Sequence, residues 1–222
     1  GHVALEDFNM SMQVTAITHK RKPVWASILS EVTPSESSVM KRVAYEPRYL
    51  AYLRDSLAIK GVRNVVMHEA LTNLRKVMFL QMAPGVPRTE VWRALHGAAN
   101  LQADIGKYVI AVSQDIDPHN ADAVFWSLAY RANPIEDVQI SPYRSSGHGP
   151  KSDGGGHEES TMLIDATLKD TNPPISLPKR EFMEHARTIW DELGLPTLKP
   201  QSPWHGYSLG DWDTVWDTYA ER

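Results

Sequence analysis

The sequence predicts an α/β fold: a mixed sheet with helices on its faces, followed by a C-terminal helical tail. Between residues 62 and 140, strand-like apolar segments alternate with segments of helical periodicity, an order that favours right-handed crossovers and parallel strands. A pair of strand-like segments near the amino terminus would make the sheet mixed. The closing residues, LGDWDTVWDTYAER, have their apolar side chains at helical spacing.

The first expected elements are the two strands of a hairpin, Ser11–His19 and Val24–Ser30, joined by a turn at Lys20–Pro23. Helical periodicity follows from Ser35 to about Lys60. Pro47 is expected near the start of a second helix in this region, because proline is tolerated in a first helical turn. Gly61 then ends the helix.

The middle of the chain contains the alternating strands and helices. A Pro/Gly turn, APGVPRTE, precedes one helix, and Asp117-Pro118 precedes the next. The expected elements are the strands Val62–His68 and Leu74–Met82, the helix Arg88–Leu101, the strand Lys107–Ser113, a helix ending before Pro134 and a short strand Val138–Ile140.

The carboxyl-terminal third begins with a Gly/Ser/Pro-rich segment, Ser141–Glu159, without periodicity; loops of this length are functional or mobile. A short apolar piece, Met162–Ile164, and a helix from about Lys179 to Leu193 follow. The prolines after Gly194 indicate a semi-rigid linker. The chain is therefore divided into an α/β domain, residues 1–195, and a linker with an aromatic helix, residues 196–222.

Composition excludes several classes of protein. The net charge of -4 and the pI near 6.1 give no electrostatic footprint for nucleic acid or an anionic membrane. The chain has no cysteine, which excludes disulfides and thiolate sites and fits a reducing, cytoplasmic location. No apolar run reaches the roughly 20 residues that span a bilayer. The opening residues, GHVALEDFNMSMQ, are typical of the interior of a longer protein.

Residues 112–134, VSQDIDPHNADAVFWSLAYRANP, run from an apolar strand through acids into a helix. Asp117 followed by Pro118 is typical of a helix N-cap with proline at the first helical position. Asp115 follows a strand, where α/β proteins often place ligand contacts. The alternatives for these acids are capping and packing, direct contact with a ligand, or a Mg²⁺ or Ca²⁺ site together with Asp122. Arg131 lies on the apolar face of the helix and is expected to pair with a carboxylate there.

Two other features are candidates for function. The long loop contains imidazole and carboxylate groups that suit zinc or another transition metal, but their spacing is not that of H-E-x-x-H, so solvated charges on a flexible loop are the alternative. These residues are His148, Asp153, His157, Glu158 and Glu159. There is no G-x-S-x-G, P-loop or G-x-G-x-x-G motif.

The aromatic tail is the second feature. Trp212, Val215, Trp216 and Tyr219 would share one face of a helix beyond the proline linker. This face either packs on the core of the same chain or docks on a neighbouring subunit or another domain, and docking is favoured because the linker separates it from the core.

KYVIAVSQDIDPHNADAVFWSLAYRANP resembles the strand–acid–helix segment of the UbiD family of carboxy-lyases, which includes polyprenyl-hydroxybenzoate and ferulic acid decarboxylases. The family segment is an apolar strand, D-D-[ID]-[DN], and then [DE]-V-[IL]-W-A-[IF]-[ST]-T-R-x-x-P. Gln114 replaces an acid that the family often has, and the matches are Asp115, Val124, Trp126, Arg131 and Pro134. The segments QVTAITHKRKPVWAS, TPSES, MLIDAT and IWDELGL resemble family segments in the same order, over about residues 1–195.

The resemblance implies that the catalytic groups lie upstream of this chain. Family members are longer and use a glutamate–arginine–carboxylate constellation, with one acid in the motif E-G-P-F-G-[ED]-x-x-G-Y. Alignment on QVTAIT places Gly1 on the last glycine of that motif and His2 on its tyrosine. The chain would therefore begin just after the catalytic acid, and the resemblance assigns no catalytic residue and no metal ligand to it.

The implied function is that of the C-terminal domain of a reversible non-oxidative decarboxylase, which mediates oligomerisation and forms a wall of the substrate pocket. The substrates would be aromatic acids, hydroxylated ones above all, or α,β-unsaturated acids. The N-terminal flavin-binding part of the same protein would hold prenylated FMN, a divalent metal (Mn²⁺ or Mg²⁺) and K⁺. This segment alone is then expected to bind no cofactor and to be inactive.

The same resemblance assigns a few positions and partners. The loop that lines the pocket in some members corresponds to Tyr143, Arg144, Ser145 and Ser146. Leu101, beside Gln102, stands where some members have a basic residue that reaches the flavin phosphate. A homo-oligomer, a dimer or larger, is expected. The alternative is a stand-alone oligomerisation or interaction module without catalysis.

Overall fold

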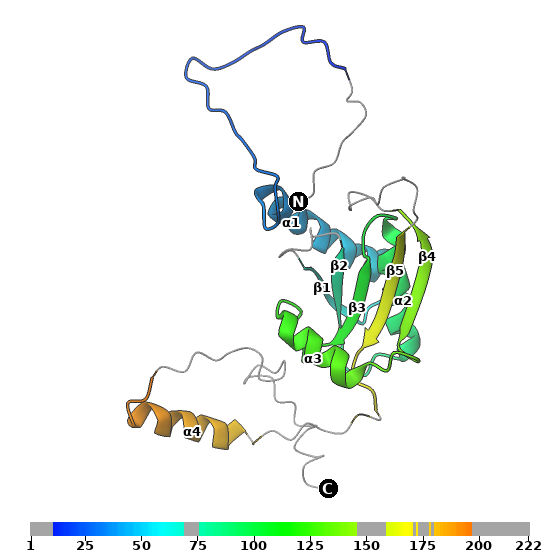
Figure 1. Cartoon of the computed structure of the whole chain (residues 1–222), viewed down its shortest axis with the longest axis vertical. Coiled ribbons are helices and arrows are strands. Elements are labelled where there is room, and N and C mark those ends of the chain that lie inside the picture. Colours follow the sequence, from blue (N-terminus) through cyan, green and yellow to red (C-terminus); the bar gives the residue numbers. More distant parts are fainter. Residues whose placement is uncertain are drawn as a thin grey trace.

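The computed structural model describes residues 11–68, 76–145, 159–170, 172, 178 and 180–196. Its centre is one five-stranded sheet with the strand order β1-β2-β3-β5-β4 (Figure 1). The neighbouring pairs β2–β3 and β3–β5 are parallel, while β1 and β4 run antiparallel at the two edges. The mixed α/β architecture predicted from the sequence is confirmed.

The strands are β1 (Val62–Met67), β2 (Val77–Met82), β3 (Tyr108–Ser113), β4 (Val138–Arg144) and β5 (Glu159–Ala166). Because side chains alternate along a strand, each strand contributes to both faces of the sheet. One face carries Val109, Ala111 and Leu163, and the other carries Ile110, Val112 and Ile164. The central parallel strands are apolar on both faces, as expected for strands between layers of helices.

Helices α1 (Glu36–Ala51) and α2 (Arg88–Leu101) cover the first face. Ser35 begins α1 with a capping box, in which its side chain accepts from the backbone N–H of Ser38 and the Ser38 hydroxyl accepts from that of Ser35. A π-helical turn, η1 (Tyr52–Ser56), continues α1. Pro47 lies inside this one continuous helix, so the second helix expected to begin near it is absent from the described chain.

Helix α3 (Ala121–Arg131) covers the second face near the carboxyl ends of the parallel strands (Figure 1). Its Ala123 and Val124 pack with Ile110, Val112 and Ile164. Helix α4 (Arg180–Glu192), expected at 179–193, lies apart from the sheet. No helix among the described residues is long and apolar enough to cross a membrane.

The predicted hairpin is wrong. Residues 11–30 contain no strand, and their apolar side chains, Trp25 among them, are exposed to solvent. β-propensity depends on packing against neighbouring strands, and this segment has no sheet to join in the described structure. The strands around the long loop are also longer than expected: β4 continues to Arg144 and β5 begins at Glu159, because the two pair with each other across a register shift.

Candidate functional site

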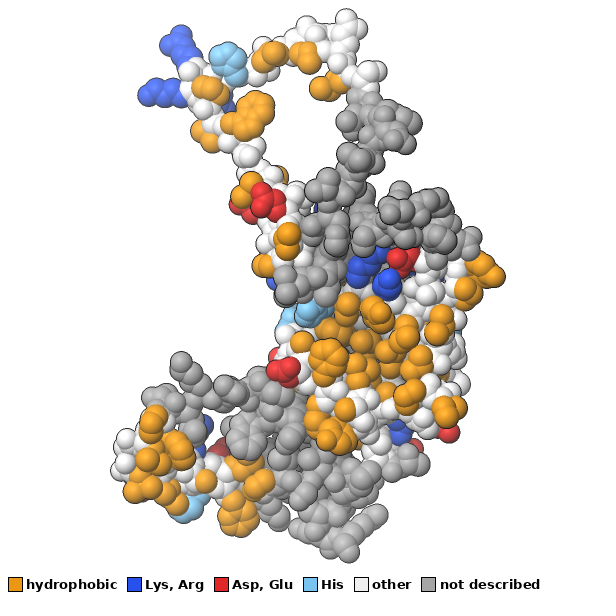
Figure 2. Space-filling view, viewed as in Figure 1, with side chains coloured by type: hydrophobic (Ala, Val, Ile, Leu, Met, Phe, Trp, Pro, Cys, Tyr) orange, Lys and Arg blue, Asp and Glu red, His pale blue; other side chains and the backbone are white. Residues whose placement is uncertain are grey.

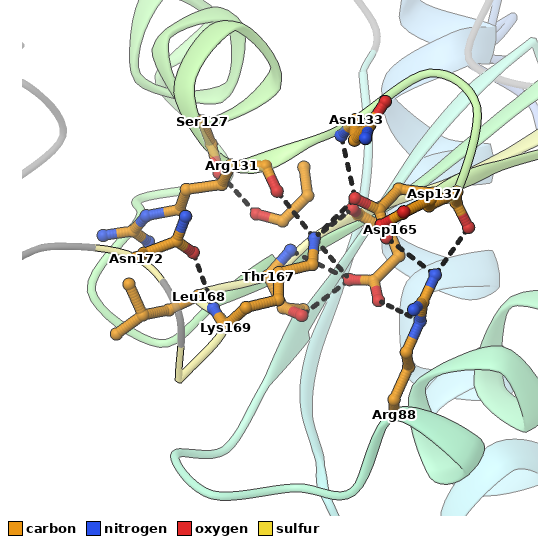
Figure 3. Close-up of polar contacts among 12 residues, drawn as sticks. Arg88, Ser127, Arg131, Asn133, Asp137, Asp165, Thr167, Leu168, Lys169 and Asn172 are labelled. Carbon is orange, nitrogen blue, oxygen red and sulfur yellow. Dashed lines mark hydrogen bonds and ion pairs between the residues drawn. The ribbon is translucent and has the colours of Figure 1, made fainter.

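Polar side chains gather where the parallel strands β3 and β5 end. Ser113 closes β3 and Ala166 closes β5, and the segments that follow turn under α3. Ligand sites of open α/β sheets form at the carboxyl ends of parallel strands, which makes this edge the candidate site. Figure 3 shows side chains from α2, α3, the α3–β4 turn and the segment after β5 converging there.

Asp115 and Arg131 form one part of this cluster. The two guanidinium nitrogens of Arg131 donate to the two carboxylate oxygens of Asp115, at 2.9 and 2.6 Å. Only 2% of the arginine side chain is exposed, and its guanidinium lies 5.0 Å from the centre of the Trp126 ring. A buried bidentate pair of this kind orients both partners, so the sequence-based expectation that Arg131 pairs with a carboxylate is confirmed.

A second part consists of two carboxylates between two cations. Arg88 donates to Asp137 at 3.0 Å and lies 4.0 Å from Asp165. Lys169 lies 3.3 Å from Asp137 and 3.6 Å from Asp165. The side chains of both acids are almost fully buried, at 6% and 1% exposed, so their charges are compensated by neighbours rather than by water.

Backbone groups complete the second cluster (Figure 3). Asp165 accepts from the backbone N–H and the hydroxyl of Thr167, at 3.0 and 2.6 Å, and so shapes the turn after β5. Asp137 accepts from the backbone N–H of Asn133 at 2.8 Å. The Lys169 ammonium also donates to the carbonyls of Arg131 and Asp165, and the hydroxyl of Ser127 donates to that of Ala166. The cluster therefore joins α2, α3, β4 and β5.

The paired charges of the second cluster indicate a structural role rather than a catalytic one. In the second cluster the formal charges balance, two carboxylates against one guanidinium and one ammonium. Each charged group has an oppositely charged partner, although the buried Oδ2 of Asp165 makes no hydrogen bond. A change in the protonation of any of these groups would therefore disturb an existing ion pair. No group of three or more His, Cys, Asp or Glu side chains placed to hold a metal occurs among the described residues.

The remaining acids of this stretch have local roles. Asp117 accepts from the backbone N–H of His119 at 2.9 Å, and Asn120, rather than Asp117, is the N-cap of α3. The Asn120 side chain accepts from the backbone N–H groups of Asp122 and Ala123. Asp122 lies in the first helical turn, where a negative charge is favourable. The predicted Asp117-Pro118 start of α3 is thus wrong by one turn, since Asp117 shapes the turn before the helix.

The expected pocket-wall residues lie at the end of β4. The backbone of Tyr143 is left-handed, with φ 62°, within the register shift between Ser141 and Arg144, and its side chain is exposed. The guanidinium of Arg144 donates to the carbonyls of Ala99, Gln102 and Ile105 and to the hydroxyl of Thr161.

These bonds satisfy backbone oxygens left open at the end of α2, so Arg144 fixes β4 to that helix. Ser145 is held through its backbone N–H, which donates to the carbonyl of Ala103. Ser146 lies outside the described residues, as do His148, Asp153, His157 and Glu158 of the predicted loop. Glu159 lies in β5 and pairs with Lys107 at 3.1 Å.

A shallow groove of about 660 Å³ lies between η1 and α2, on the opposite face of the sheet from α3. Gly97 lets the two elements approach, because a Cβ at this position would lie 2.6 Å from Cδ1 of Leu57. The groove has apolar walls, which include Tyr52, Leu57, Ile59 and Trp92. Arg93 and His96 lie at its basic rim.

Comparison with known proteins decides the family. The sequence profile of the 3-octaprenyl-4-hydroxybenzoate carboxy-lyase C-terminal domain matches residues 38–166, more than half of the chain. This chain belongs to the UbiD family. The match runs from the first turn of α1 to the end of β5, so it contains the Asp115–Arg131 pair and both carboxylates of the second cluster, but not Lys169. It identifies the chain as the C-terminal region of a UbiD-family protein.

Solved UbiD-class enzymes share this fold. The UbiD-class enzyme HmfF from Pelotomaculum thermopropionicum, solved with FMN, has a TM-score of 0.57 and 23% identity, over 68% of this chain and 34% of its own. Vanillic acid decarboxylase from Sedimentibacter hydroxybenzoicus has a TM-score of 0.58 and 18% identity, over 79% of this chain and 38% of its own. An uncharacterized protein of Synechocystis is 25% identical over 202 residues, 88% of this chain and 37% of the relative. The chain thus spans little more than a third of these proteins.

Leu101 and Gln102, at the position where some members of the family place a basic residue near the flavin phosphate, present no cation. Leu101 packs against the core beneath α2, and the side-chain oxygen of Gln102 is buried. Lys107 is paired with Glu159, and Arg144 donates to the carbonyl of Gln102. A phosphate would need a cation or N–H groups free to donate, and of these two side chains only the amide of Gln102 can donate a hydrogen bond.

The clusters around Asp137 and Asp165 were not predicted from the sequence. MLIDAT indicated a strand and a family segment, and Arg88 only the start of a helix. The sequence does contain one signal for this cluster: Asp165 lies at the end of an apolar segment, and Lys169 follows it four residues later. The partner residues come from elements far apart in the chain, which no local pattern reveals.

Proposed function

We propose that this chain is the oligomerisation and substrate-pocket-wall domain of a reversible non-oxidative decarboxylase of aromatic acids, hydroxylated ones above all, or of α,β-unsaturated acids. The observation that carries the proposal is the family match over residues 38–166, a region in which the buried acids Asp115, Asp137 and Asp165 all have cationic partners. That pairing suits a rigid support better than a reacting centre. The cytoplasmic location expected from the sequence stays a prediction.

The substrate class is supported by the structural neighbours. The names of two of them, vanillic acid decarboxylase and the 3,4-dihydroxybenzoic acid decarboxylase of Enterobacter cloacae, specify hydroxylated aromatic acids. HmfF is solved with FMN and, in an evolved dimeric form, with prFMN. We infer that prenylated FMN, with Mn²⁺ or Mg²⁺ and K⁺, is held by an N-terminal part of the complete protein. Loss of CO₂ would leave a carbanion, and a bound prenylated flavin would supply the electron sink that it needs.

Within this chain, we place the pocket wall at the end of β4. The Tyr143 side chain is free to meet a substrate, while Arg144 is a positioning residue whose bonds to the carbonyls of α2 keep the wall in place. A phenolic hydroxyl beside the substrate suits a hydroxylated ring, because it both donates and accepts hydrogen bonds. The bulge in β4 directs this side chain, as bulges beside active sites commonly do.

The test compares the 222-residue chain with the same chain joined to a UbiD-type flavin-binding part. Both are supplied with prenylated FMN, Mn²⁺ and K⁺ and assayed for CO₂ release from hydroxybenzoic and cinnamic acids. We expect turnover only in the joined form. Turnover by the 222-residue chain alone would place catalytic residues within it. No turnover in either form, with the flavin part active when joined to its own C-terminal domain, would favour the stand-alone interaction module.

A further inference from the structure

The groove between η1 and α2 is formed in part by a stripe of α2 that stays outside the core. Trp92, His96 and Asn100 recur at four-residue spacing, and Arg93 and Gly97 lie beside them on the same side of the helix. The buried side of α2 consists of Val91, Ala94, Leu95, Ala98 and Ala99. The stripe therefore makes one wall of the groove, opposite η1.

The size and the walls of this groove suit a small organic molecule. Tyr52 and Leu57 line the η1 side and Trp92 lines the α2 side, while the fully buried Ile59 borders the groove from the core. The volume of about 660 Å³ lies within the range of roughly 300–1,000 Å³ that small-molecule sites occupy, and such sites combine apolar walls with a few polar groups. The rings of Tyr52 and Trp92 favour an aromatic ligand, because aromatic rings pack well in offset or edge-to-face pairs.

Arg93 and His96 bring hydrogen-bond donors to the rim. A terminal nitrogen of Arg93 donates to the carbonyl of Leu57 at 3.0 Å, which is the one bond that this guanidinium makes within the described structure. Since a guanidinium has five N–H donors, Arg93 retains donors for a ligand. Nε2 of His96 donates to Oε1 of Gln139 at 3.0 Å, so a protonated His96 offers its Nδ1–H as well. One carboxylate can reach both side chains, because they lie one helical turn apart.

The charges around the groove are complementary to an anion. None of the described residues that line it is acidic. Arg88, the third cation of the lining, is already bonded to Asp137 and to the carbonyl of Glu136. Residues 36–63, which include α1 and η1, contain six lysines and arginines against three acids, whereas the whole chain has a net charge of -4. This side of the molecule therefore attracts anionic ligands.

We propose that the groove between η1 and α2 binds a small aromatic acid. Its ring lies between Leu57 and Trp92, and its carboxylate accepts hydrogen bonds from Arg93 and His96. A guanidinium can hold a carboxylate through two parallel bonds, which makes Arg93 the main anchor. The proposal goes beyond the decarboxylase proposal, because the acid is bound in this groove and is not converted there. Binding is tested without flavin, so the failure of either test leaves the other proposal standing.

A second apolar surface supplies a control. Figure 2 shows apolar side chains over the face of the sheet that carries α3. On β3 the exposed fraction on that face rises from 0% at Val112 to 40% at Tyr108, and Ile140 of β4 is 63% exposed. A ligand held by hydrophobic contact alone would bind at this surface too, so Ile140→Ser distinguishes the two places.

The probe is 2-naphthoate, and its binding to the full 222-residue chain is measured by equilibrium dialysis. We expect a Kd of about 1 mM or tighter, as for a ligand of this size. 2-Naphthamide has the same rings without the charge, and it should bind at least about fivefold more weakly, as should 2-naphthoate to Arg93→Met. Arg63→Met, which removes an exposed arginine outside the groove, and Ile140→Ser should leave the Kd unchanged. The indole N–H resonance of Trp92, assigned by its loss in Trp92→Phe, should shift during the titration.

The other outcomes overturn the proposal. Equal binding of 2-naphthamide by the parent chain, or an unchanged Kd in Arg93→Met, would show that the rim holds no anion. A weaker Kd in Ile140→Ser would place the probe on the face that carries α3. Binding that is lost when the chain is joined to a UbiD-type flavin-binding part would show that the groove is an interface with that part. No binding at concentrations up to about 10 mM would show that the groove holds no small acid.

Discussion

At the scale of residues, Arg131 shows how burial limits the role of a charge. Its guanidinium is almost fully enclosed, bonded to both oxygens of Asp115 and stacked near Trp126. Removal of one partner leaves the other charge buried without compensation, which costs more than the pair contributes. The pair therefore holds the end of β3 to α3, a structural role that does not depend on the activity of the complete protein.

Arg131→Met should lower the free energy of unfolding by about 3–5 kcal/mol, measured by urea denaturation, because Asp115 loses its buried partner. Arg131→Lys keeps the charge but cannot form the two-pronged bond, so we expect an intermediate loss. In the double variant Asp115→Asn/Arg131→Met the loss should be smaller than the sum of the single losses. A loss below about 1 kcal/mol for Arg131→Met would show that the pair contributes no more to stability than an ion pair exposed on the surface.

Some of these site residues can be predicted from the sequence and others cannot. Arg131 and Asp115 flank one helix, so the apolar face of that helix indicated the pair. Asn120 was missed as the cap because Asp117-Pro118 carries the stronger local signal, yet the Asp117 side chain bonds two residues ahead and closes a turn instead. Arg88, Asp137 and Asp165 come from three elements, and only the folded sheet brings them together.

At the scale of elements, periodicity predicts those that pack against the sheet. Helix α2 has the predicted bounds, because Ala94, Leu95 and Ala98 recur at helical spacing against the core. The hairpin at 11–30 fails for the opposite reason: its β-forming residues have no neighbouring strand among the described residues. Similarly, β4 contains Pro142 and a bulge. Because proline is rare inside strands, the sequence predicted a loop from Ser141 onward.

The bulge in β4 gives a prediction that separates stability from substrate contact. A tyrosine in a left-handed conformation costs roughly 1–2 kcal/mol, a cost that glycine avoids. Tyr143→Gly should therefore be more stable than Tyr143→Ala by about 1 kcal/mol in urea denaturation. In the complete decarboxylase that we propose, both variants lose the phenol, so both should raise KM for a hydroxylated aromatic acid several-fold. An unchanged KM in both would remove Tyr143 from the pocket wall.

At the scale of the whole molecule, the sheet has one fully covered face and one that is open at its amino end. On the covered face, α1, η1 and α2 enclose a core in which Tyr49 is completely buried. Its hydroxyl has no hydrogen-bond partner among the described residues. Burial, and secondarily the negative charge of Asp104, raises the pKa of Tyr49 well above its ordinary value near 10.

This raised pKa makes the stability of the whole molecule sensitive to alkali. Below pH of about 10 the tyrosine is neutral in both states, and its contribution to stability is fully present. Above that pH the unfolded chain loses the proton while the folded chain retains it, so the free energy of unfolding falls. Tyr49→Phe removes this loss. It should also leave stability at pH 8 within about 1 kcal/mol of the parent, because the buried hydroxyl makes no bond there.

Urea denaturation between pH 8 and about pH 11.5 measures the difference. We expect the curve of Tyr49→Phe to fall less steeply above pH of about 10 than that of the parent. Tyr130→Phe removes an exposed phenol from α3 and should follow the parent curve throughout. If the Tyr49→Phe and parent curves run parallel over the whole range, the hydroxyl of Tyr49 has a partner or solvent access that keeps its pKa ordinary, and α1 is then less tightly closed over the sheet than the buried tyrosine indicates.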